Sequence, residues 1–227
     1  MFRVGPTMAL YAFFAILPVL ASASGREDID NMDCFTLTAL ERDAEHDDAT
    51  AQLKLSTLYM NGKCVSQDWQ MAGVWLNRSA KAGYAPAQAA LAGMFHKARM
   101  DAETVQWAQR AAEQGEPFGE GLLAYSFEKG KGVEVDYVEA AKWAKRAAGQ
   151  GNALGQLILG NLYADGKGGL PNDLIEADKW YILFEKSSKI SPEENGIRKL
   201  CELHMRKSET LEAKKRADAW QAEPKVQ

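Results

Sequence analysis

The sequence predicts an all-α protein, built as an array of two-helix units with helical caps. Residues that favour helices dominate between Ala39 and Lys186, and alternation of β-branched or aromatic residues with a period of two is scarce there. Four tryptophans recur at intervals of 32, 36 and 37 residues. Periods in this range are typical of α-solenoids, in which each unit is too small to fold alone and buries its apolar face against its neighbours.

Each complete copy of the unit carries the same residues around a glycine-rich turn. Glycine adopts positive φ angles at little cost, so we expect a turn between two helices at this point. An aspartate then stands where a helix N-cap accepts hydrogen bonds from free backbone N–H groups. A tryptophan follows seven residues later, within a stripe of alanines that predicts a buried helix face. These positions are Gly62, Gly130 and Gly166 for the turn, Asp68, Asp136 and Asp173 for the cap, and Trp75, Trp143 and Trp180 for the stripe.

The first helix of each unit carries a leucine and, four residues later, an aromatic residue. A small residue directly after the leucine lets a neighbouring helix approach closely. The small residues are Ser56, Ala92, Ala124 and Gly160.

A second copy of the unit is shortened. It keeps Trp107 but lacks the glycine loop and is four residues shorter, so we expect a local bend that exposes Arg99 and Met100. The tryptophans could line a ligand cage instead of a core. Their place in the alanine stripe favours a structural role for all four.

The turn Gly130-Lys131-Gly132 raises the alternative of a phosphate-binding loop, because a glycine-rich loop before a helix can bind anions through backbone N–H groups. The pattern of such loops also requires a lysine followed by serine or threonine at the start of the helix, and none is present. A loop that recurs in three copies, each with a cap aspartate and a tryptophan, is better explained as part of the architecture.

These features resemble the Sel1-like repeat family, which is related to the tetratricopeptide repeats. In the first copy the matching residues are Ala51, Leu55, Tyr59, Gly62, Val65, Asp68, Ala72, Trp75, Ala80 and Gly83. The third copy matches well, the fourth has one inserted residue around Gly168-Gly169, and the second departs most. The resemblance, over about residues 48–186, implies a right-handed α-solenoid of helix–turn–helix repeats that acts as a protein-interaction scaffold.

The N-terminus reads as a secretory signal. Arg3 precedes an apolar run from Met8 to Leu20, and Ala21-Ser22-Ala23 fits a cleavage site. An uncleaved membrane anchor is the alternative, although the apolar run is short for a membrane span. The expected segments are a signal peptide at 1–23, an acidic linker and N-terminal cap helix at 24–47, repeat 1 at 48–83, the shortened repeat 2 at 84–115, repeat 3 at 116–151, repeat 4 at 152–187, and C-terminal cap helices with a tail at 188–227.

Three cysteines remain after signal removal. In an oxidising compartment we expect a disulfide between Cys34 and Cys64, which are about thirty residues apart near one end of the molecule, and a remaining thiol at Cys201. Cys201 and His204 would share one helix face and could begin a metal site, but no second pair of ligands accompanies them.

Composition and motifs argue against several classes of function. The net charge is −4, and residues 24–48 hold nine acidic residues against two arginines, which disfavours binding to nucleic acids or to anionic membranes. The three histidines are scattered, and no catalytic Ser/His/Asp or Cys/His set is evident. We therefore expect no catalytic residue, metal, cofactor or small-molecule substrate, and no membrane insertion after signal cleavage.

The predicted binding surface is the concave wall, which the resemblance assigns to the first helix of each repeat. Positions one before the leucine and two before the aromatic residue should face the groove. The candidates are Lys54, Thr57, Leu122, Tyr125, Ile158 and Asn161. Packing of the apolar members of this set against the next helix is the alternative.

The sequence thus favours an exported, most simply periplasmic, protein-binding scaffold that acts as an adaptor or regulator. An immunity protein that neutralises a secreted antibacterial effector enzyme is the alternative. An enzyme or hydrolase is a remote third possibility, since it would require titratable groups gathered in one cleft.

Overall fold

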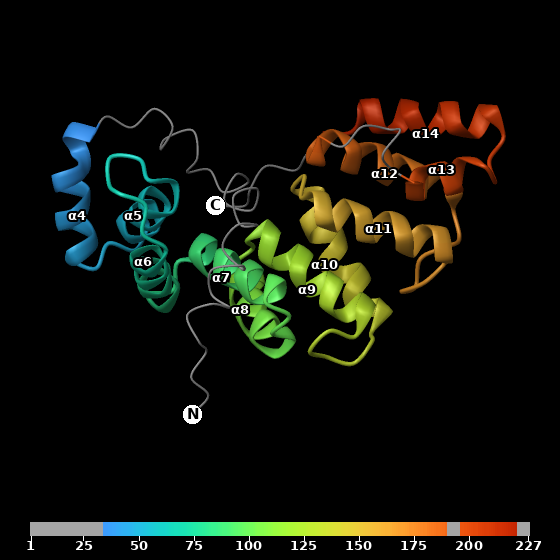
Figure 1. The fold of residues 1–227 in the computed structure, drawn as a ribbon. Coiled ribbons are helices and arrows are strands. Elements are labelled where there is room, and N and C mark those ends of the chain that lie inside the picture. Colours follow the sequence, from blue (N-terminus) through green and yellow to red (C-terminus); the bar gives the residue numbers. More distant parts are fainter. Residues whose placement is uncertain (1–33, 190–195, 222–227) are drawn as a thin grey trace. The chain divides into compact units, whose positions relative to one another are not determined.

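The computed structural model describes residues 34–189 and 196–221 (Figure 1). The predicted signal peptide and most of the acidic linker lie outside the described residues, as does the end of the C-terminal tail. The described residues form eleven α-helices and one short 3-10 helix, and they contain no strand. The prediction of an all-α fold is therefore confirmed. Two compact units divide between Glu116 and Pro117.

Unit 1 contains the N-terminal cap and the first two helix pairs. Helix α5 packs against α6 and α7 packs against α8, while α4 covers α5 and α6 contacts α7. The elements are η1 (Cys34–Thr36), α4 (Leu37–Glu45), α5 (Ala49–Asn61), α6 (Trp69–Lys81), α7 (Ala85–Lys97) and α8 (Asp101–Glu113).

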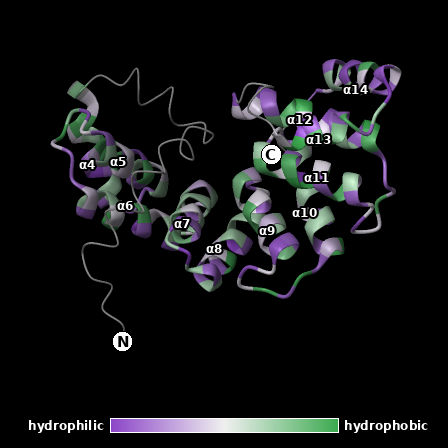
Figure 2. Ribbon diagram, turned by 45° about the vertical axis from the view of Figure 1, so that its right-hand side comes forward, coloured by the Kyte–Doolittle hydropathy of each residue, from purple (hydrophilic) through white to green (hydrophobic). Residues whose placement is uncertain are grey.

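Unit 2 contains two further helix pairs and the C-terminal helices. Helix α9 packs against α10 and α11, α11 packs against α12, and α12 is covered by α13 and α14. The elements are α9 (Pro117–Lys129), α10 (Tyr137–Gly149), α11 (Ala153–Asp165), α12 (Leu174–Ser188), α13 (Gly196–Glu202) and α14 (Lys207–Ala219). Helix α14 consists mostly of hydrophilic residues, as expected for the outer layer of a repeat array (Figure 2).

The recurring aspartates begin the second helix of each complete pair. One carboxylate oxygen of Asp68 accepts hydrogen bonds from the backbone N–H groups of Gln70 and Met71, and Asp136 and Asp173 make the same pair of bonds. These bonds satisfy two of the N–H groups that a helix start leaves free. At the other end of the turn, Gly62 and Gly166 end their helices in the left-handed conformation.

The core lies between the paired helices. Trp75, Trp143 and Trp180 are 7%, 9% and 8% exposed, and Trp107 packs half-buried against the core of unit 1. The second helices pack against their neighbours largely through alanines that are essentially inaccessible to solvent. In α10 these are Ala140, Ala141, Ala144, Ala147 and Ala148. Small side chains at these positions allow close helix packing.

Two glutamines tie consecutive helices together through the backbone. The Gln88 side-chain amide donates to the carbonyl oxygen of Ala80, near the end of the preceding helix, at 3.2 Å. The Gln52 amide donates to Ala44 O in the cap helix α4 at 3.0 Å. Both glutamines stand three residues before the core leucine of their repeat. The last turn of α4 thus supplies a carbonyl acceptor to repeat 1, and the last turn of α6 supplies the equivalent acceptor to repeat 2.

The small residue after the core leucine permits close approach, as the sequence predicted. A Cβ atom added at Gly160 would lie 2.6 Å from the ring of Tyr181, so α12 can pack this closely only against glycine. In repeat 1 the Ser56 hydroxyl donates to Ala72 O of α6 at 2.7 Å.

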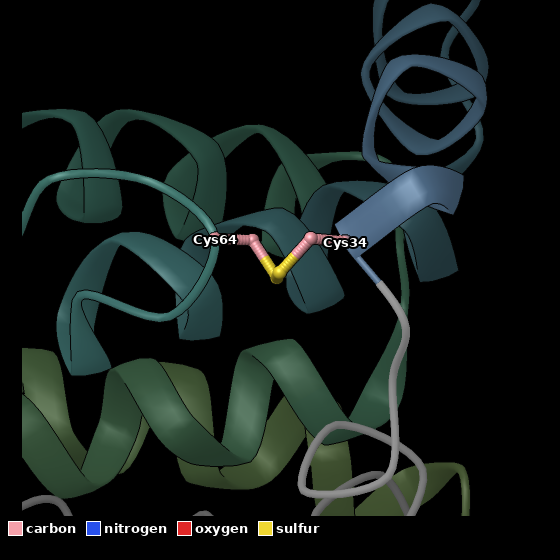
Figure 3. Close-up of a disulfide and its surroundings, with 2 residues drawn as sticks. All are labelled: Cys34 and Cys64. Atoms are coloured by element: carbon pink, nitrogen blue, oxygen red, sulfur yellow. A yellow bond between two sulfur atoms is a disulfide. The ribbon is translucent and has the colours of Figure 1, made fainter.

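The predicted disulfide between Cys34 and Cys64 is present (Figure 3). It joins η1, at the start of the cap, to the turn between α5 and α6. Cys64 has a φ of 63° and stands two residues after Gly62, where repeats 3 and 4 carry Gly132 and Gly168, also at positive φ. The cysteine therefore occupies a glycine position of the repeat. The remaining thiol, Cys201, is buried, and its burial raises the pKa to about 11.

The C-terminal cap is attached through buried charges. The carboxylates of Asp178 and Glu185 on α12 are 0% and 7% exposed, and Arg198 of α13 contacts them at 2.8 and 2.9 Å. The corresponding positions of α10 are Ala141 and Ala148. The last repeat helix thus carries two acidic residues where α10 carries alanines, and the cap supplies the arginine that pairs with them.

Candidate functional site

The predicted groove residues divide between the two units, so each set is considered alone. Lys54 and Thr57 lie on α5 of unit 1, while Leu122 and Tyr125 on α9 and Ile158 and Asn161 on α11 belong to unit 2. In unit 1, Lys54 is half-buried and Thr57 is 7% exposed. The Thr57 hydroxyl donates to Leu53 O of its own helix at 3.0 Å, so this polar group is used within α5.

Leu122 and Ile158 do not face solvent, which corrects the expectation that they form an exposed apolar patch. Each side chain is only 1% exposed. The physical reason is that both helices are covered by neighbours: α9, which carries Leu122, packs against α10 and α11, and α11, which carries Ile158, packs against α9, α10 and α12. The position directly before the core leucine therefore still lies within the buried part of the helix surface.

Tyr125 and Asn161 are half-buried on neighbouring helices of unit 2. Glu128 stands three residues after Tyr125 and so shares its face of α9. The Asn161 amide nitrogen donates to Glu128 Oε1 at 3.2 Å, which links α11 to α9. Asn161 Oδ1 accepts a hydrogen bond from the hydroxyl of Tyr181 on α12 at 3.1 Å. We call Glu128, Asn161 and Tyr181 the Asn161 cluster.

The two outer members of the cluster are buried and held in place. The Glu128 side chain is 8% exposed, with Lys129 Nζ 3.1 Å from Oε1. Its other oxygen, Oε2, is buried and has no hydrogen-bond partner among the described residues. The Tyr181 ring is 2% exposed and rests on Gly160. Burial raises the pKa of Tyr181 far above its ordinary value, with nearby acidic groups adding to the effect, so the phenol remains a neutral donor.

The cluster fixes the orientation of the Asn161 amide. A carboxylate can only accept hydrogen bonds, so the NH₂ group must face Glu128 and the oxygen must face Tyr181. An asparagine amide has two N–H donors and an oxygen with two lone pairs. One donor and one lone pair of Asn161 are used within the cluster, and the side chain as a whole is half-buried.

Reasoning from the sequence selected Asn161 and Tyr125 but missed Glu128 and Tyr181. Glu128 could have been found because it lies one helical turn after Tyr125. Tyr181 follows Trp180 at a position where the first three repeats carry Leu76, Ala108 and Ala144. A polar aromatic residue there, opposite the glycine at position 160, is the signal that could have indicated a partner for Asn161.

The described residues offer no metal centre. Residues 34–189 and 196–221 contain no group of three or more histidine, cysteine, aspartate or glutamate side chains that could hold a metal ion. The Cys201 thiol contacts Leu174 O at 3.7 Å, whereas His204 lies in the turn after α13, with Nδ1 2.9 Å from Leu200 O. The same part of the chain contains no helix with the length and apolar character needed to cross a membrane.

Comparison with known proteins identifies the repeats. The sequence model of the Sel1 repeat matches residues 49–84, 101–116, 119–152 and 153–184. In the second copy the match covers only residues 101–116, which contain helix α8. No curated protein matches the chain significantly.

Solved structures similar to this chain include the following two proteins. One is c5321, described as a protective antigen present in uropathogenic Escherichia coli strains displaying an SLR fold, with 24% identity and a TM-score of 0.69 over 92% of this chain and 44% of that chain. The other is a Sel1 repeat protein from Oxalobacter formigenes, with 35% identity and a TM-score of 0.52 over 55% of this chain and 97% of that chain. The chain thus spans less than half the length of the first structure.

Proposed function

The chain belongs to the Sel1 repeat family, whose fold generally serves as a protein–protein interaction scaffold, and we propose that it is an exported adaptor or regulator that binds a partner polypeptide. The proposed contact surface is the face of α9 and α11 in unit 2 that carries Tyr125 and Asn161. The proposal assigns no catalytic reaction to the protein.

The observation that carries the proposal is the Asn161 cluster. A half-buried amide is held by two buried side chains from different helices, and a half-buried tyrosine, Tyr125, stands one helical turn before Glu128 on α9. Binding surfaces gain affinity when their polar groups are already oriented, because less side-chain entropy is lost on binding. Tyrosine is enriched at such surfaces because its large ring contributes contact area and its hydroxyl contributes hydrogen bonding.

Export is supported by two features. The disulfide between Cys34 and Cys64 indicates an oxidising compartment. The residues before it carry an apolar run followed by Ala21-Ser22-Ala23, as in a secretory signal. We propose the periplasm as the location. Fractionation of cells expressing the full chain, with mass measurement of the released protein, tests both the compartment and cleavage after Ala23.

The binding proposal is tested by capturing partners from an envelope extract with Tyr125→Ala and a matched control. Tyr137 on α10 is also half-buried, and its ring is contacted by Lys167, so Tyr137→Ala removes the same side chain from another face. We expect Tyr125→Ala to weaken capture and Tyr137→Ala to leave it unchanged. Equal capture by both variants, with both folded, would refute the assigned surface.

An immunity role is the alternative form of the same binding activity. It would differ from an adaptor in binding one effector enzyme at nanomolar affinity or tighter and abolishing that enzyme's activity. A captured partner that retains its full activity in the complex therefore supports the adaptor or regulator.

A further inference from the structure

We propose that the C-terminal cap, which comprises α13, α14 and the turn between them, binds the surface of an anionic lipid bilayer. This surface is separate from the α9–α11 face, so the inference goes beyond the proposed function and does not depend on it. It follows from three features of the cap: exposed leucines on its outer side, positive charge beside them, and attachment of the cap to the last repeat helix.

The first feature is a group of exposed apolar side chains, which we call the cap apolar patch. Seven large apolar side chains are strongly exposed in the described part of the chain, and four of them fall between residues 197 and 211. These four are Ile197, Leu200, Leu203 and Leu211, with exposed fractions of 45%, 63%, 77% and 68%. Single exposed apolar residues are common, but four this close together at the end of a repeat array mark an interaction surface.

The patch lies open because other side chains of the cap make its packing contacts. On α14, Ala213 and Ala217 are buried, and on α13 Cys201 is buried within a cluster that includes residues of α12. Leu211 stands two residues before Ala213, a rotation of about 200° around the helix, so the two side chains lie on opposite sides of α14. The outer side of α14 therefore carries Leu211.

The second feature is positive charge around Leu211. Each of the three acidic side chains of α14 is already in an ion pair. These pairs are Glu209–Arg206, Glu212–Arg216 and Asp218–Lys186. Three further lysines, Lys207, Lys214 and Lys215, are exposed and stand three or four residues from Leu211, on the same face of the helix. This local surplus is opposite in sign to the net charge of −4, which disfavours anionic membranes for the chain as a whole.

The combination of lysine and leucine favours lipid over protein as the occupant. Protein–protein interfaces are depleted in lysine and enriched in aromatic residues. The strongly exposed apolar residues of the cap are all aliphatic, and Trp220 packs against Trp180 with ring centroids 6.0 Å apart. An anionic bilayer attracts each lysine and takes up leucines at the boundary between headgroups and acyl chains. A second copy is disfavoured, because two such faces would bring like charges together.

The third feature is the attachment of the cap. Arg198 of α13 contacts the buried carboxylates of Asp178 and Glu185 on α12, and Lys186 of α12 contacts Asp218 of α14. A bilayer that holds the cap therefore also holds the last repeat helix. The expected state is peripheral, since the leucines reach only the interfacial region and the chain does not span the bilayer.

Sedimentation with lipid vesicles tests the proposal on the exported protein, which begins at Ser24. The apolar run from Met8 to Leu20 would itself bind lipid, so its removal is first verified by mass measurement. The probes are vesicles of phosphatidylcholine alone and of phosphatidylcholine with about one third phosphatidylglycerol. We expect the protein to bind only the anionic vesicles and to be released as the salt concentration rises, because salt screens the attraction of the lysines.

Two variants identify the surface. Leu203→Ser removes apolar contact and Lys215→Glu reverses one charge, and each should weaken partitioning into anionic vesicles about tenfold. Val138→Ser and Lys145→Glu are the matched controls, since they make equivalent changes at exposed positions of α10. Both controls should bind like the wild-type protein. Thermal unfolding verifies that all four variants remain folded.

Every outcome supports or overturns the proposal. Equal binding by Leu203→Ser and Val138→Ser, or binding that does not depend on lipid charge, would overturn it. Poly-glutamate is the second probe, because it offers negative charge without an apolar phase. If poly-glutamate binds as tightly as the vesicles and depends equally on Leu203, the occupant is an acidic protein. If light scattering shows a dimer that Leu203→Ser dissociates, the occupant is a second copy, and the membrane inference is wrong in both cases.

These experiments are separate from those on the α9–α11 face. Capture of a partner that depends on Tyr125 would stand even if the cap bound no vesicle. Binding of vesicles through Leu203 would likewise stand if Tyr125→Ala left partner capture unchanged.

Discussion

Arg198 Nε lies 2.8 Å from Asp178 Oδ1, and this contact joins the cap helix α13 to the last repeat helix α12. The same guanidinium contacts Glu185 at 2.9 Å and Glu202 at 2.9 Å. Asp178 and Glu185 are almost fully buried on α12, so one arginine compensates two carboxylates that have little access to water. Charge pairing thus adds to the apolar contact that Cys201 makes with Ala177 and Tyr181 of α12.

Removing the arginine should be costly at neutral pH. Arg198→Met leaves buried carboxylates without their counter-charge, and we expect the free energy of unfolding to fall by about 3 kcal/mol. Burial already holds the pKa of Asp178 above its ordinary value, and loss of Arg198 removes an opposing contribution, so that pKa rises further. Between about pH 7 and 5 the folded variant then binds protons that the unfolded chain does not bind, so its stability increases as the pH falls.

Urea unfolding at these two pH values measures the effect. The control is the triple variant Asp178→Asn, Glu185→Gln and Arg198→Met, which has no buried charge at this contact and should lose this pH dependence. If Arg198→Met loses the same free energy of unfolding at both pH values, the interpretation is contradicted.

The disulfide offers a second prediction, because Cys64 stands at a glycine position. Replacing both cysteines by serine should lower the free energy of unfolding by about 3–4 kcal/mol, chiefly through the greater entropy of the unfolded chain. Replacing Cys34 by serine and Cys64 by glycine should recover about 1 kcal/mol of this loss. Glycine adopts the φ of 63° without the cost that other residues incur there. Denaturant melts of the oxidised wild type and the two variants check the order of stability.

Gly160 provides a third prediction. The Cβ of Gly160→Ala would lie 2.6 Å from the Tyr181 ring, so α12 must shift and the hydrogen bond from Tyr181 to Asn161 should weaken. We expect a loss of about 1–3 kcal/mol despite alanine's higher helix propensity. Gly196→Ala, at the start of α13, meets no atom within 4 Å and serves as the control, which should be neutral or slightly stabilising. Equal stability of both variants in thermal melts would contradict the packing described here.

Two arginines that lie over tryptophans allow a fourth prediction. The guanidinium carbons of Arg78 and Arg146 each lie 4.8 Å from the ring centroid of Trp75 and Trp143. Only Arg146 also contacts a buried carboxylate, Glu120, at 2.7 Å.

Arg78→Ala should therefore cost about 0.5–1 kcal/mol, the typical value for an exposed cation–π contact. Arg146→Ala should cost about 2–3 kcal/mol more, because it removes the cation next to the buried Glu120 carboxylate, which still accepts a hydrogen bond from the neutral Gln150 amide. Chemical unfolding of the two single variants measures the difference, and equal losses would show that the ion pair contributes nothing to stability.

The parts of the fold that depend on residues close together in the sequence could be predicted from it. The cap role of Asp136 requires only the two N–H groups that follow it, and the turn at Gly62 requires only a residue that tolerates positive φ. Recurrence of the cap aspartate and the turn glycine at a fixed spacing then indicates stacked helix pairs. The disulfide could be predicted because the repeat pattern brings the cap close to the turn that carries Cys64.

The candidate site was harder to predict, because it depends on contacts between helices. Leu122 and Ile158 occupy expected groove positions, but α11 is covered on three sides, and this cannot be judged from spacing within one helix. Asn161 could be selected by position alone. Its role depends on Glu128, which precedes it by 33 residues, and on Tyr181, which follows it by 20. Such pairings follow from the angle and depth of helix packing, which repeat spacing does not specify.

The glutamine bonds from Gln52 to Ala44 and from Gln88 to Ala80 have a consequence for how the chain can be rebuilt. A glutamine of α5 donates to a carbonyl oxygen in the last turn of α4, just as a glutamine of α7 donates to one in the last turn of α6. The cap helix α4 and the repeat helix α6 therefore offer the next helix the same acceptor. An additional unit copied from this chain and spliced between α4 and α5 would meet a matching acceptor at both of its junctions. We therefore expect the array to accept a whole additional unit at its N-terminal end.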